Sequence, residues 1–494
     1  MLPEHFNHPE DRLHVVAGAV IIALLVLFGT QQVGEWQTLA GLAFLSVIAL
    51  AFQRYEYAIL LSMFLLPLSA ARIVPREMLG VTGLNPFNIA LLVAALVVVL
   101  TRVMQPARLT LPVLPRPLVL YIGVLVFATF NGVGHVAAIP PYFKALQVIA
   151  FDSPAGYVVE VFIKPLLILF TLMLVAAGVA NAKNPRRFMA PLFISAVVFP
   201  LLVLADVLTS ETPLSALSGG GESFSGMHVN ELGLMFNMAL SLALWCIFSR
   251  GSGGLRRLWL GCTIGLLTVG IALTFSRGAY LGFLTVVGYF LLRKRRFDLL
   301  LLGLLALPVA IMFMPQSVLQ RASTGLGNGD VDAISAGRVN DIWRPLLPEL
   351  ASSPVVGQGL SSVLWSAAAR TNNFFTAGRI GHPHSAYLGM LLDFGLAGAA
   401  VIVGFFLHMW RTFALLAARH PEPVWRDFFN GAGACILVLI IQGVTDDRVT
   451  PTVAQTFLWL AYGMALGFLT HVPGRAPGPG GPTSRPARIG SAAP

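Results

Sequence analysis

The stretch from residue 382 to residue 409 reads HPHSAYLGMLLDFGLAGAAVIVGFFLHM, and it begins where a long polar segment ends. From residue 384 onward it is apolar over a length that can span a membrane as a helix, which needs about 20 residues. His384 stands at the expected boundary between membrane and water. An ionisable group is costly to keep there unless something uses it, and histidine suits proton transfer near neutral pH. The stretch therefore predicts a membrane protein and marks His384 as a candidate functional residue.

The composition of the whole chain supports this interpretation. Of its 494 residues, 56% are hydrophobic and 11% are charged, whereas soluble domains carry about 25% charged residues. The net charge of +10 comes from basic residues in short links between apolar runs, as the positive-inside rule demands. No basic stripe with interleaved aromatic residues is present, so we do not expect a nucleic-acid partner.

The hydrophobic pattern predicts an all-α, polytopic transmembrane helix bundle with 12 to 14 spans, since several early runs are short. A head with Glu4, Glu10, Asp11 and Arg12 precedes the first run, which argues for a retained helix and against a signal peptide. The candidate spans are residues 14–30, 36–52, 55–71, 87–101, 118–136, 161–180, 189–209, 232–249, 256–274, 278–292, 298–315, 384–409, 428–444 and 453–471.

Lysine and arginine collect in every second link, which predicts that both termini face the cytoplasm. The expected organisation is transmembrane helices 1–11 in residues 1–315 and one large outward loop in residues 316–382. C-terminal transmembrane helices follow in residues 383–472, and a disordered cytoplasmic tail occupies residues 473–494. In a bacterium the outward loop would lie in the periplasm.

The outward loop contains the pattern of an amphipathic helix. Apolar residues recur at helical spacing, while polar residues occupy the other face and Pro345 and Pro348 are expected to kink the helix or end it early. We expect this helix to lie at the membrane surface above the bundle. The apolar stripe comprises Val339, Ile342, Trp343, Leu346, Leu347 and Leu350, and the polar face comprises Arg338, Asn340, Asp341 and Arg344.

Two further outward links carry polar groups next to apolar runs. One reads Phe275-Ser276-Arg277-Gly278-Ala279-Tyr280, and its arginine could bind phosphate oxygens with a forked geometry that lysine lacks. The other contains His228 and Asn230, just before the span at 232–249. Taken singly, Arg277 is equally well explained as a snorkelling side chain, and His384 as a helix cap.

No metal site is expected. The three cysteines, Cys246, Cys262 and Cys435, lie inside apolar runs without ligand spacing. The pair Asp330 and Asp332 has the spacing of a cation-binding motif of sugar-nucleotide transferases, but a solvated loop explains this pair better.

The ordered set of outward segments resembles the bacterial O-antigen ligase and O-antigen polymerase superfamily, over roughly residues 225–410. The matching pieces are Gly226…His228…Asn230…Leu232-Gly233, Ser276-Arg277-Gly278-Ala279, Gly337-Arg338…Trp343, Pro354…Gly357-Gln358-Gly359 and His384…Tyr387-Leu388…Asp393-Phe394-Gly395-Leu396.

The resemblance implies a GT-C-like glycosyltransferase that works without a metal or other cofactor. Its donor would be a glycan on undecaprenyl diphosphate, and its acceptor either lipid A–core or a second lipid-linked glycan. His384 would be the catalytic base, with His382 as the competing histidine. Arg277, Arg338 and Arg379 would bind the diphosphate. We expect the remaining polar residues of these segments, His228, Asn230, Trp343, His382 and Asp393, to position substrate.

Two other classes of protein are alternatives to an enzyme. A transporter or flippase would use charges within the membrane, for which Glu160, Lys164 and Asp206 are candidates. It would also be expected to show an internal repeat, which the sequence lacks. A structural assembly protein would have no use for arginine and histidine at outward helix boundaries. The sequence therefore favours an enzyme of the bacterial inner membrane.

Overall fold

The fold was analysed in a computed structural model of the chain. The structure describes residues 55–71, 74–75, 77–78, 81–104, 109–145, 148–209, 223–224, 226–250, 253–296, 298, 312, 332, 335, 337–371, 381–445 and 448–470. The expected spans at 14–30 and 36–52 and the tail lie outside these residues, as does nearly all of the span at 298–315.

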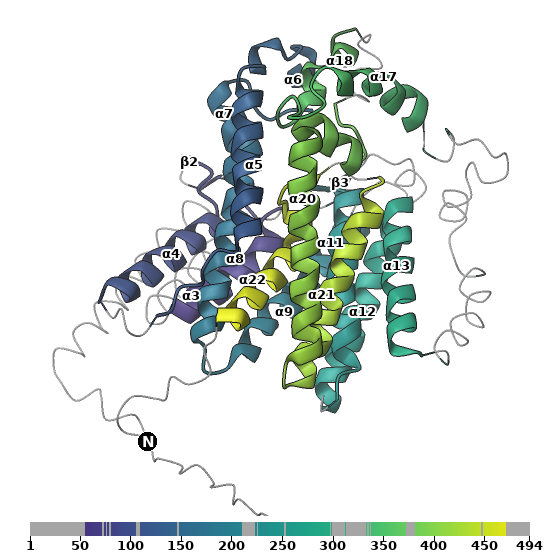
Figure 1. The fold of residues 1–494 in the computed structure, drawn as a ribbon. Helices are drawn as coiled ribbons and strands as arrows, with labels where there is room; N and C mark the ends of the chain where they lie inside the picture. Colours follow the sequence, from purple (N-terminus) through teal and green to yellow (C-terminus); the bar gives the residue numbers. More distant parts are fainter. Residues whose placement is uncertain are drawn as a thin grey trace, which may run out of the picture.

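The described part of the chain is helical, apart from two short antiparallel hairpins (Figure 1). Its longer helices are α3 (Tyr55–Leu68), α4 (Pro86–Met104), α5 (Arg116–Val133), α8 (Lys164–Asn181), α9 (Met189–Thr209), α11 (Val229–Ile247), α12 (Gly254–Leu273), α13 (Arg277–Lys294), α20 (Ala386–Arg419), α21 (Pro423–Gln442) and α22 (Thr456–Thr470). The shorter α-helices are α6 (Tyr142–Ala145), α7 (Pro154–Val158), α17 (Arg344–Leu346) and α18 (Ala367–Thr371), and the strands are β1 (Glu77–Met78), β2 (Val81–Thr82), β3 (Ser223–Phe224) and β4 (Met227–His228). The 3-10 helices are η2 (Val136–Ala138), η4 (Pro185–Phe188), η6 (Leu347–Ala351), η7 (Ser362–Trp365) and η8 (Val453–Gln455), and the π-helical turns are η3 (Val159–Ile163) and η5 (Val339–Trp343).

Nine helices of the described part are long and apolar enough to cross a membrane. This finding confirms the prediction of an all-α polytopic bundle. The expected span at 161–180 begins earlier than its apolar run, because α7, η3 and α8 form one continuous 28-residue helix over Pro154–Asn181. Helix α13 is not among the nine, since Arg277, Arg293 and Lys294 lower its hydropathy.

The core lies where α11 packs against α21 and α8 packs against α22. Glycines allow the second contact, because a methyl group at Gly463 would lie 2.6 Å from the Leu172 carbonyl oxygen. A stack of aromatic rings holds α5 to α20 and α22: the Tyr121 and Phe405 centroids are 4.5 Å apart, and Phe405 stacks on Trp459 at 5.9 Å. These contacts fix the helices whose ends carry the polar residues of interest.

Helix α20 is broken at Gly395, which has φ 62° and ψ −172°. The span predicted at 384–409 corresponds to this helix, which extends to Arg419, and the apolar run gave no sign of the break. The backbone of residues 354–359 lies against the break: the Leu396 and Ala397 amides donate to the carbonyls of Pro354 and Val355 at 2.9 and 3.0 Å. A side chain at position 395 would collide with Val355, since its Cβ would lie 2.4 Å from that backbone. Only glycine fits this close approach.

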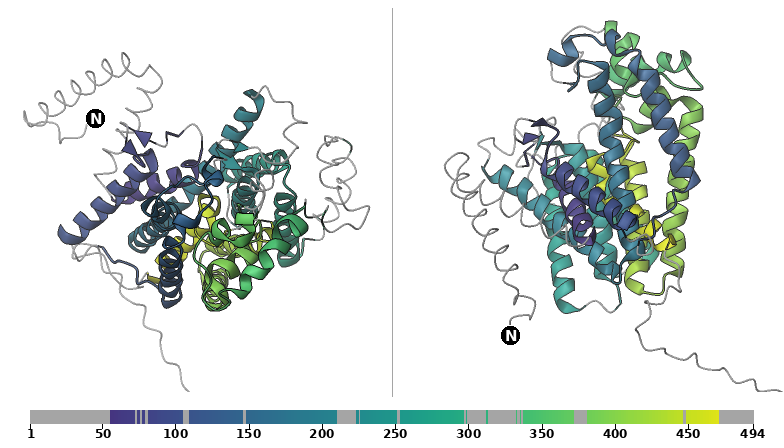
Figure 2. Two further views of the ribbon diagram at one scale, coloured as in Figure 1. Left: turned by 90° about the horizontal axis from the view of Figure 1, so that it is seen from above. Right: turned by 90° about the vertical axis from the view of Figure 1, so that its left-hand side faces the viewer.

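Residues 338–371, called the roof below, stand above the bundle next to the end of α5 (Figure 1 and the right panel of Figure 2). The helix predicted here is present, but it changes type along its length, from η5 through α17 to η6, and continues past Pro345 and Pro348. Its apolar side packs against the part of α20 that precedes Gly395, in a small core separate from the main one. This roof core comprises Ile342, Leu346, Val363, Ala368, Leu388 and Leu392, with Trp343 and Leu350 packed against it. Leu347, expected in the same stripe, is 54% exposed.

Candidate functional site

The turn Gln442–Thr445, which begins at the last residue of α21, receives the beginnings of two helices that carry candidate residues, and we call it the hub. Helix α20 begins on it, because the Ala386 amide donates to the Gly443 carbonyl at 2.7 Å. Helix α13 begins on it too, because a methyl group at Gly278 would lie 2.3 Å from the Thr445 hydroxyl oxygen. Arg277 immediately precedes Gly278, and His384 lies two residues before Ala386. Two candidate residues more than 100 positions apart in the sequence are thus close along the chain to residues that contact the same turn.

His384 lies two residues before the start of α20 and is partly buried. Its backbone has φ 48°, a left-handed conformation that is uncommon for a residue with a side chain. The segment is held from above, because the Trp343 indole donates to the Pro383 carbonyl at 2.9 Å. His382 lies beside it, with ring centroids 6.1 Å apart and an edge-on geometry. The structure therefore keeps both histidines of the sequence prediction in one place.

Arg277 is the first residue of α13 and is also partly buried. Ser276 caps this helix by accepting from the Ala279 amide, and its hydroxyl donates to Asn230 Oδ1 at 2.7 Å. Phe275, directly before the cap, has φ 49°. Strained backbone of this kind gathers at sites where the surrounding structure over-determines it. Phe275 is adjacent to Ser276, which binds Asn230 of α11. His384 is adjacent to Pro383, whose carbonyl binds Trp343 of the roof.

His228 and Asn230 lie at the start of α11. His228 ends strand β4 and caps the helix, with Nδ1 accepting from the Asn230 amide at 3.2 Å. Asn230 then receives the Ser276 hydroxyl, so α11 and α13 begin side by side. The structure brings both predicted residues to the end of the bundle that carries Arg277 and His384.

Arg338 begins the roof helix, and Asp332 caps that helix. The Asp332 carboxylate accepts from the Asn340 amide at 3.0 Å, and its carbonyl accepts from the Gly337 amide at 2.8 Å. Asp332 thus stabilises the beginning of the roof helix. Arg379, Asp330, Asp446 and Asp447 lie outside the described residues.

Asp393 holds the roof to α20. Its carboxylate accepts from the amides of Ser361 and Ser362 at 3.1 and 3.0 Å and from the Ser362 hydroxyl at 2.7 Å. Its carbonyl accepts from the Gly359 amide at 3.1 Å. These contacts fix the glycine-containing turn at 357–359. The next residue, Leu360, binds α5, because its amide donates to the Ala128 carbonyl at 3.1 Å. Any effect of Asp393 on substrate would act through this turn.

Sequence reasoning missed two buried amides, one at the first residue of the hub and one in the neighbouring helix α11. Asn237 in α11 is fully buried and donates to the Ala279 carbonyl at 2.8 Å, while Gln442 ends α21 and is 2% exposed. Both contact Gly282 closely enough that a methyl group there would lie 2.6 Å from Asn237 Nδ2 and 2.8 Å from the Gln442 amide carbon. A single amide inside an apolar run does not stand out in the sequence, and only the fold shows that both amides pack against Gly282.

Among the described residues no three His, Cys, Asp or Glu side chains gather as ligands of a metal ion would. The site is instead defined by imidazoles, guanidinium groups and hydroxyls at the ends of helices. Such an arrangement can take a proton from a hydroxyl group and bind an oxyanion.

The fold and the site together define a multi-pass membrane protein with one polar site where helix ends meet beneath a roof. Residues 262–403 match the family model described as O-antigen ligase. The match supports membership of the O-antigen ligase and polymerase superfamily, and it indicates a glycosyltransferase of the O-antigen ligase family that acts on lipid-linked glycans. It includes Arg277, Arg338 and His384 but begins after His228 and Asn230. A search of curated proteins found no match.

Proposed function

We propose that the protein moves a glycan from undecaprenyl diphosphate to a sugar hydroxyl at the outer face of the bacterial inner membrane, as an O-antigen ligase does. The observation that carries the proposal is the hub. The segments that bear His384 and Arg277 both contact this one turn. The roof, which bears Arg338, contacts the His384 segment through the hydrogen bond from Trp343 to Pro383.

In the proposed reaction, a hydroxyl oxygen of the acceptor attacks the anomeric carbon of the donor sugar. The bond from that carbon to the diphosphate oxygen breaks, and the diphosphate leaves with the electron pair. His384 takes the hydroxyl proton as general base. Arg277 and Arg338 stabilise the charge that grows on the diphosphate, with Arg379 as a further candidate. The reaction inverts the anomeric centre and uses no metal, as the family resemblance implies.

The proposed orientation places the hub outside the cytoplasm and both termini inside. It is supported by the opposite ends of the same helices. Lys183, Arg186 and Arg187 precede α9, Arg250, Arg256 and Arg257 surround the start of α12, and Arg293–Arg296 end α13. Such clusters mark the cytoplasmic side.

The alternative acceptor is a second lipid-linked glycan, which would make the protein a polymerase of O-antigen or exopolysaccharide. The motifs of the site are shared by both activities. A competition assay separates them: labelled donor is supplied with lipid A–core and with a second lipid-linked glycan, and the elongated species is identified. The ligase proposal expects label on lipid A–core, and label on the lipid-linked glycan alone would establish the polymerase.

A transporter fits the described charges less well. Glu160 and Lys164 pair with each other at 2.5 Å, one turn apart, and both side chains are accessible at 34% and 59%. Paired, accessible charges near the beginning of a helix are not the midplane site that transport requires.

The test of the base is a pair of single variants, His384→Ala and His382→Ala, in purified protein with donor and acceptor. We expect His384→Ala to lower turnover by about 100-fold or more, the low end of what general base catalysis contributes, with an unchanged unfolding temperature. Full turnover in His384→Ala together with loss in His382→Ala would reassign the base. Loss of turnover on adding a chelator, restored by a divalent cation, would disprove the metal-free reaction.

A further inference from the structure

A strongly cationic surface occupies the end of the bundle opposite the hub. Helix α11 has 19 residues, so its two ends are about 28 Å apart, close to the thickness of a hydrocarbon core. Within the described residues this end carries one carboxylate that faces the cations before α9, that of Glu422, which pairs with Arg186 at 2.8 Å. Asp427, on the same helix, already pairs with Lys294. The surface therefore has an excess of positive charge.

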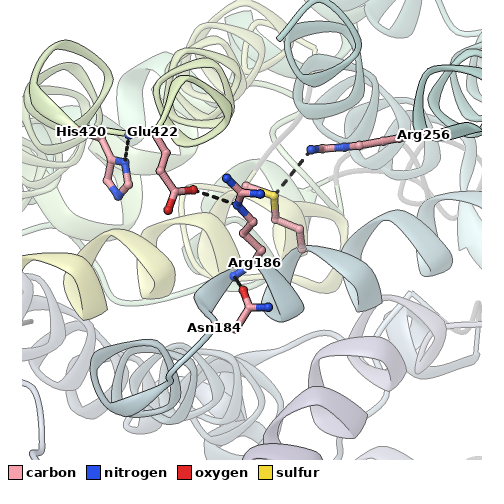
Figure 3. Close-up of polar contacts among 6 residues, drawn as sticks. Asn184, Arg186, Arg256, His420 and Glu422 are labelled. Atoms are coloured by element: carbon pink, nitrogen blue, oxygen red, sulfur yellow. Dashed lines mark hydrogen bonds and ion pairs between the residues drawn. The ribbon is translucent and has the colours of Figure 1, made fainter. Parts of the chain in front are cut away.

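A cavity of about 270 Å³ opens in this surface between α9 and α12. Arg186, from the turn before α9, and Arg256, from α12, both line it, and Figure 3 shows the two side chains. Its remaining wall is apolar and includes Phe193 and Leu260, together with Ile194 and Trp259, which are 44% and 45% exposed.

The two guanidinium groups have donors to spare. In the described part of the chain, the one polar contact of Arg256 is a weak one, to the Met189 sulfur at 4.0 Å. Arg186 uses Nε for Glu422, which leaves its terminal nitrogens for another acceptor (Figure 3). Arg256 is partly buried and Arg186 is exposed, and a guanidinium group can bind a phosphate through two parallel hydrogen bonds.

We propose that this cavity binds the phosphate of an anionic phospholipid from the leaflet at this end of the bundle. The phosphodiester lies between Arg186 and Arg256, and an acyl chain follows the exposed apolar side chains of Ile194 and Trp259. Tryptophan prefers the level of lipid headgroups, and basic pockets between membrane helices on the cytoplasmic side bind anionic headgroups. A soluble phosphate would gain from the arginines but would leave the apolar wall uncovered.

This inference is independent of the proposed glycosyl transfer, since none of its residues belongs to the site at the hub. If the proposed orientation holds, the lipid is one of the cytoplasmic leaflet. The bound lipid would add a contact between η4 and α12 beside the long contact from Arg256 to the Met189 sulfur.

The test measures binding of dioctanoyl phosphatidylglycerol to the full-length protein in neutral detergent. The variant is Arg256→Gln, and the matched control is Arg257→Gln, whose exposed side chain does not line the cavity. We expect a 10- to 100-fold weaker Kd for Arg256→Gln, the loss of about one charge-assisted contact, and an unchanged Kd for Arg257→Gln. Equal binding by wild type and Arg256→Gln would overturn the proposal.

Two further ligands distinguish the source of the phosphate. Dioctanoyl phosphatidylcholine should bind at least 10-fold more weakly than phosphatidylglycerol, and inorganic phosphate should not displace the lipid at millimolar concentration. Equal affinity for phosphatidylcholine would show that the negative headgroup is not recognised. Displacement by phosphate would identify a site for soluble anions. Either result would overturn the assignment to an anionic lipid.

Discussion

At the residue scale, the site depends on how closely α11 and α13 approach. Gly233 of α11 faces Ala279 of α13, and a methyl group at position 233 would lie 2.3 Å from the Ala279 Cβ and 3.2 Å from its Cα. Ala279 is two residues from Arg277 and accepts a hydrogen bond from Asn237. The position of the guanidinium is therefore set by the absence of a side chain on the neighbouring helix.

We expect Gly233→Ala to reduce turnover by about 10- to 100-fold, because a displacement near 1 Å is enough for such a loss. The same overpacking should lower the free energy of unfolding by about 1–3 kcal/mol. Turnover and thermal unfolding of the purified variant measure the two effects.

Two variants control this result. Gly288→Ala, in helix α13, adds a methyl group where no atom lies within 4 Å, and should keep both turnover and stability. The double variant Gly233→Ala with Ala279→Gly removes the clash and should recover turnover. If the double variant stays as inactive as the single one, the close approach does not position Arg277.

The candidate residues were recognisable in the sequence because polar groups are conspicuous next to apolar runs. His384, Arg277, His228 and Asn230 were found in this way, and the structure gathers them at one end of the bundle. Asn237 and Gln442 were not found, since a single amide inside a span has no local signal. Their meaning depends on α11 and α21 being neighbours, which is a property of the tertiary fold.

At the element scale, the roof helix is held by a small core of its own. Leu346 is fully buried there and packs with residues of α20, whereas Leu347, the next residue, is 54% exposed. The helix periodicity of the sequence predicted both as apolar contacts. It could not show that the helix changes type at Arg344 and Leu347 and so rotates Leu347 outward.

Leu346→Ala should destabilise the roof by about 2–5 kcal/mol, the usual cost of emptying a buried leucine site. Hydrogen exchange of the amides of η5 and of residues 385–392 measures the loss as faster exchange. Leu347→Ala should change the free energy of opening, as hydrogen exchange reports it, by no more than about 0.5 kcal/mol, as surface substitutions do. Equal protection in Leu346→Ala and wild type would show that the roof does not depend on this core.

The break in α20 illustrates what a hydropathy pattern omits. Residues 384–409 form one apolar run, and only the φ of Gly395 and the backbone packed against it show two helices. Asp393-Phe394-Gly395-Leu396 contained the cause, but a glycine within an apolar run is common in membrane helices. The approach of residues 354–359 is the long-range contact that makes this glycine necessary.

At the scale of the whole molecule, the distribution of charge predicts the orientation. The roof should lie outside the cytoplasm, and the start of α12 should lie inside. Single cysteines at Leu347 and at Leu255, which is 83% exposed, can report the two sides. Cys262 is exposed and is first replaced by serine, while Cys246 and Cys435 are buried.

In right-side-out membrane vesicles, an impermeant maleimide should label the Leu347→Cys variant at once. The Leu255→Cys variant should react only after the vesicles are permeabilised. The variant that carries only Cys246 and Cys435 gives the background. The reverse pattern would place the hub in the cytoplasm and would be incompatible with a donor in the outer leaflet.

The roof helix rests on a patch of side chains that it shares with the beginning of α20, whereas α11, α21 and α22 are buried in the main core. On heating, the roof should therefore unfold at a lower temperature than the main core. The few apolar contacts above the hub melt first, and His384 loses the support that reaches it through Trp343 while the spans are still intact. On heating, turnover should therefore be lost several degrees below the temperature at which the helix content falls.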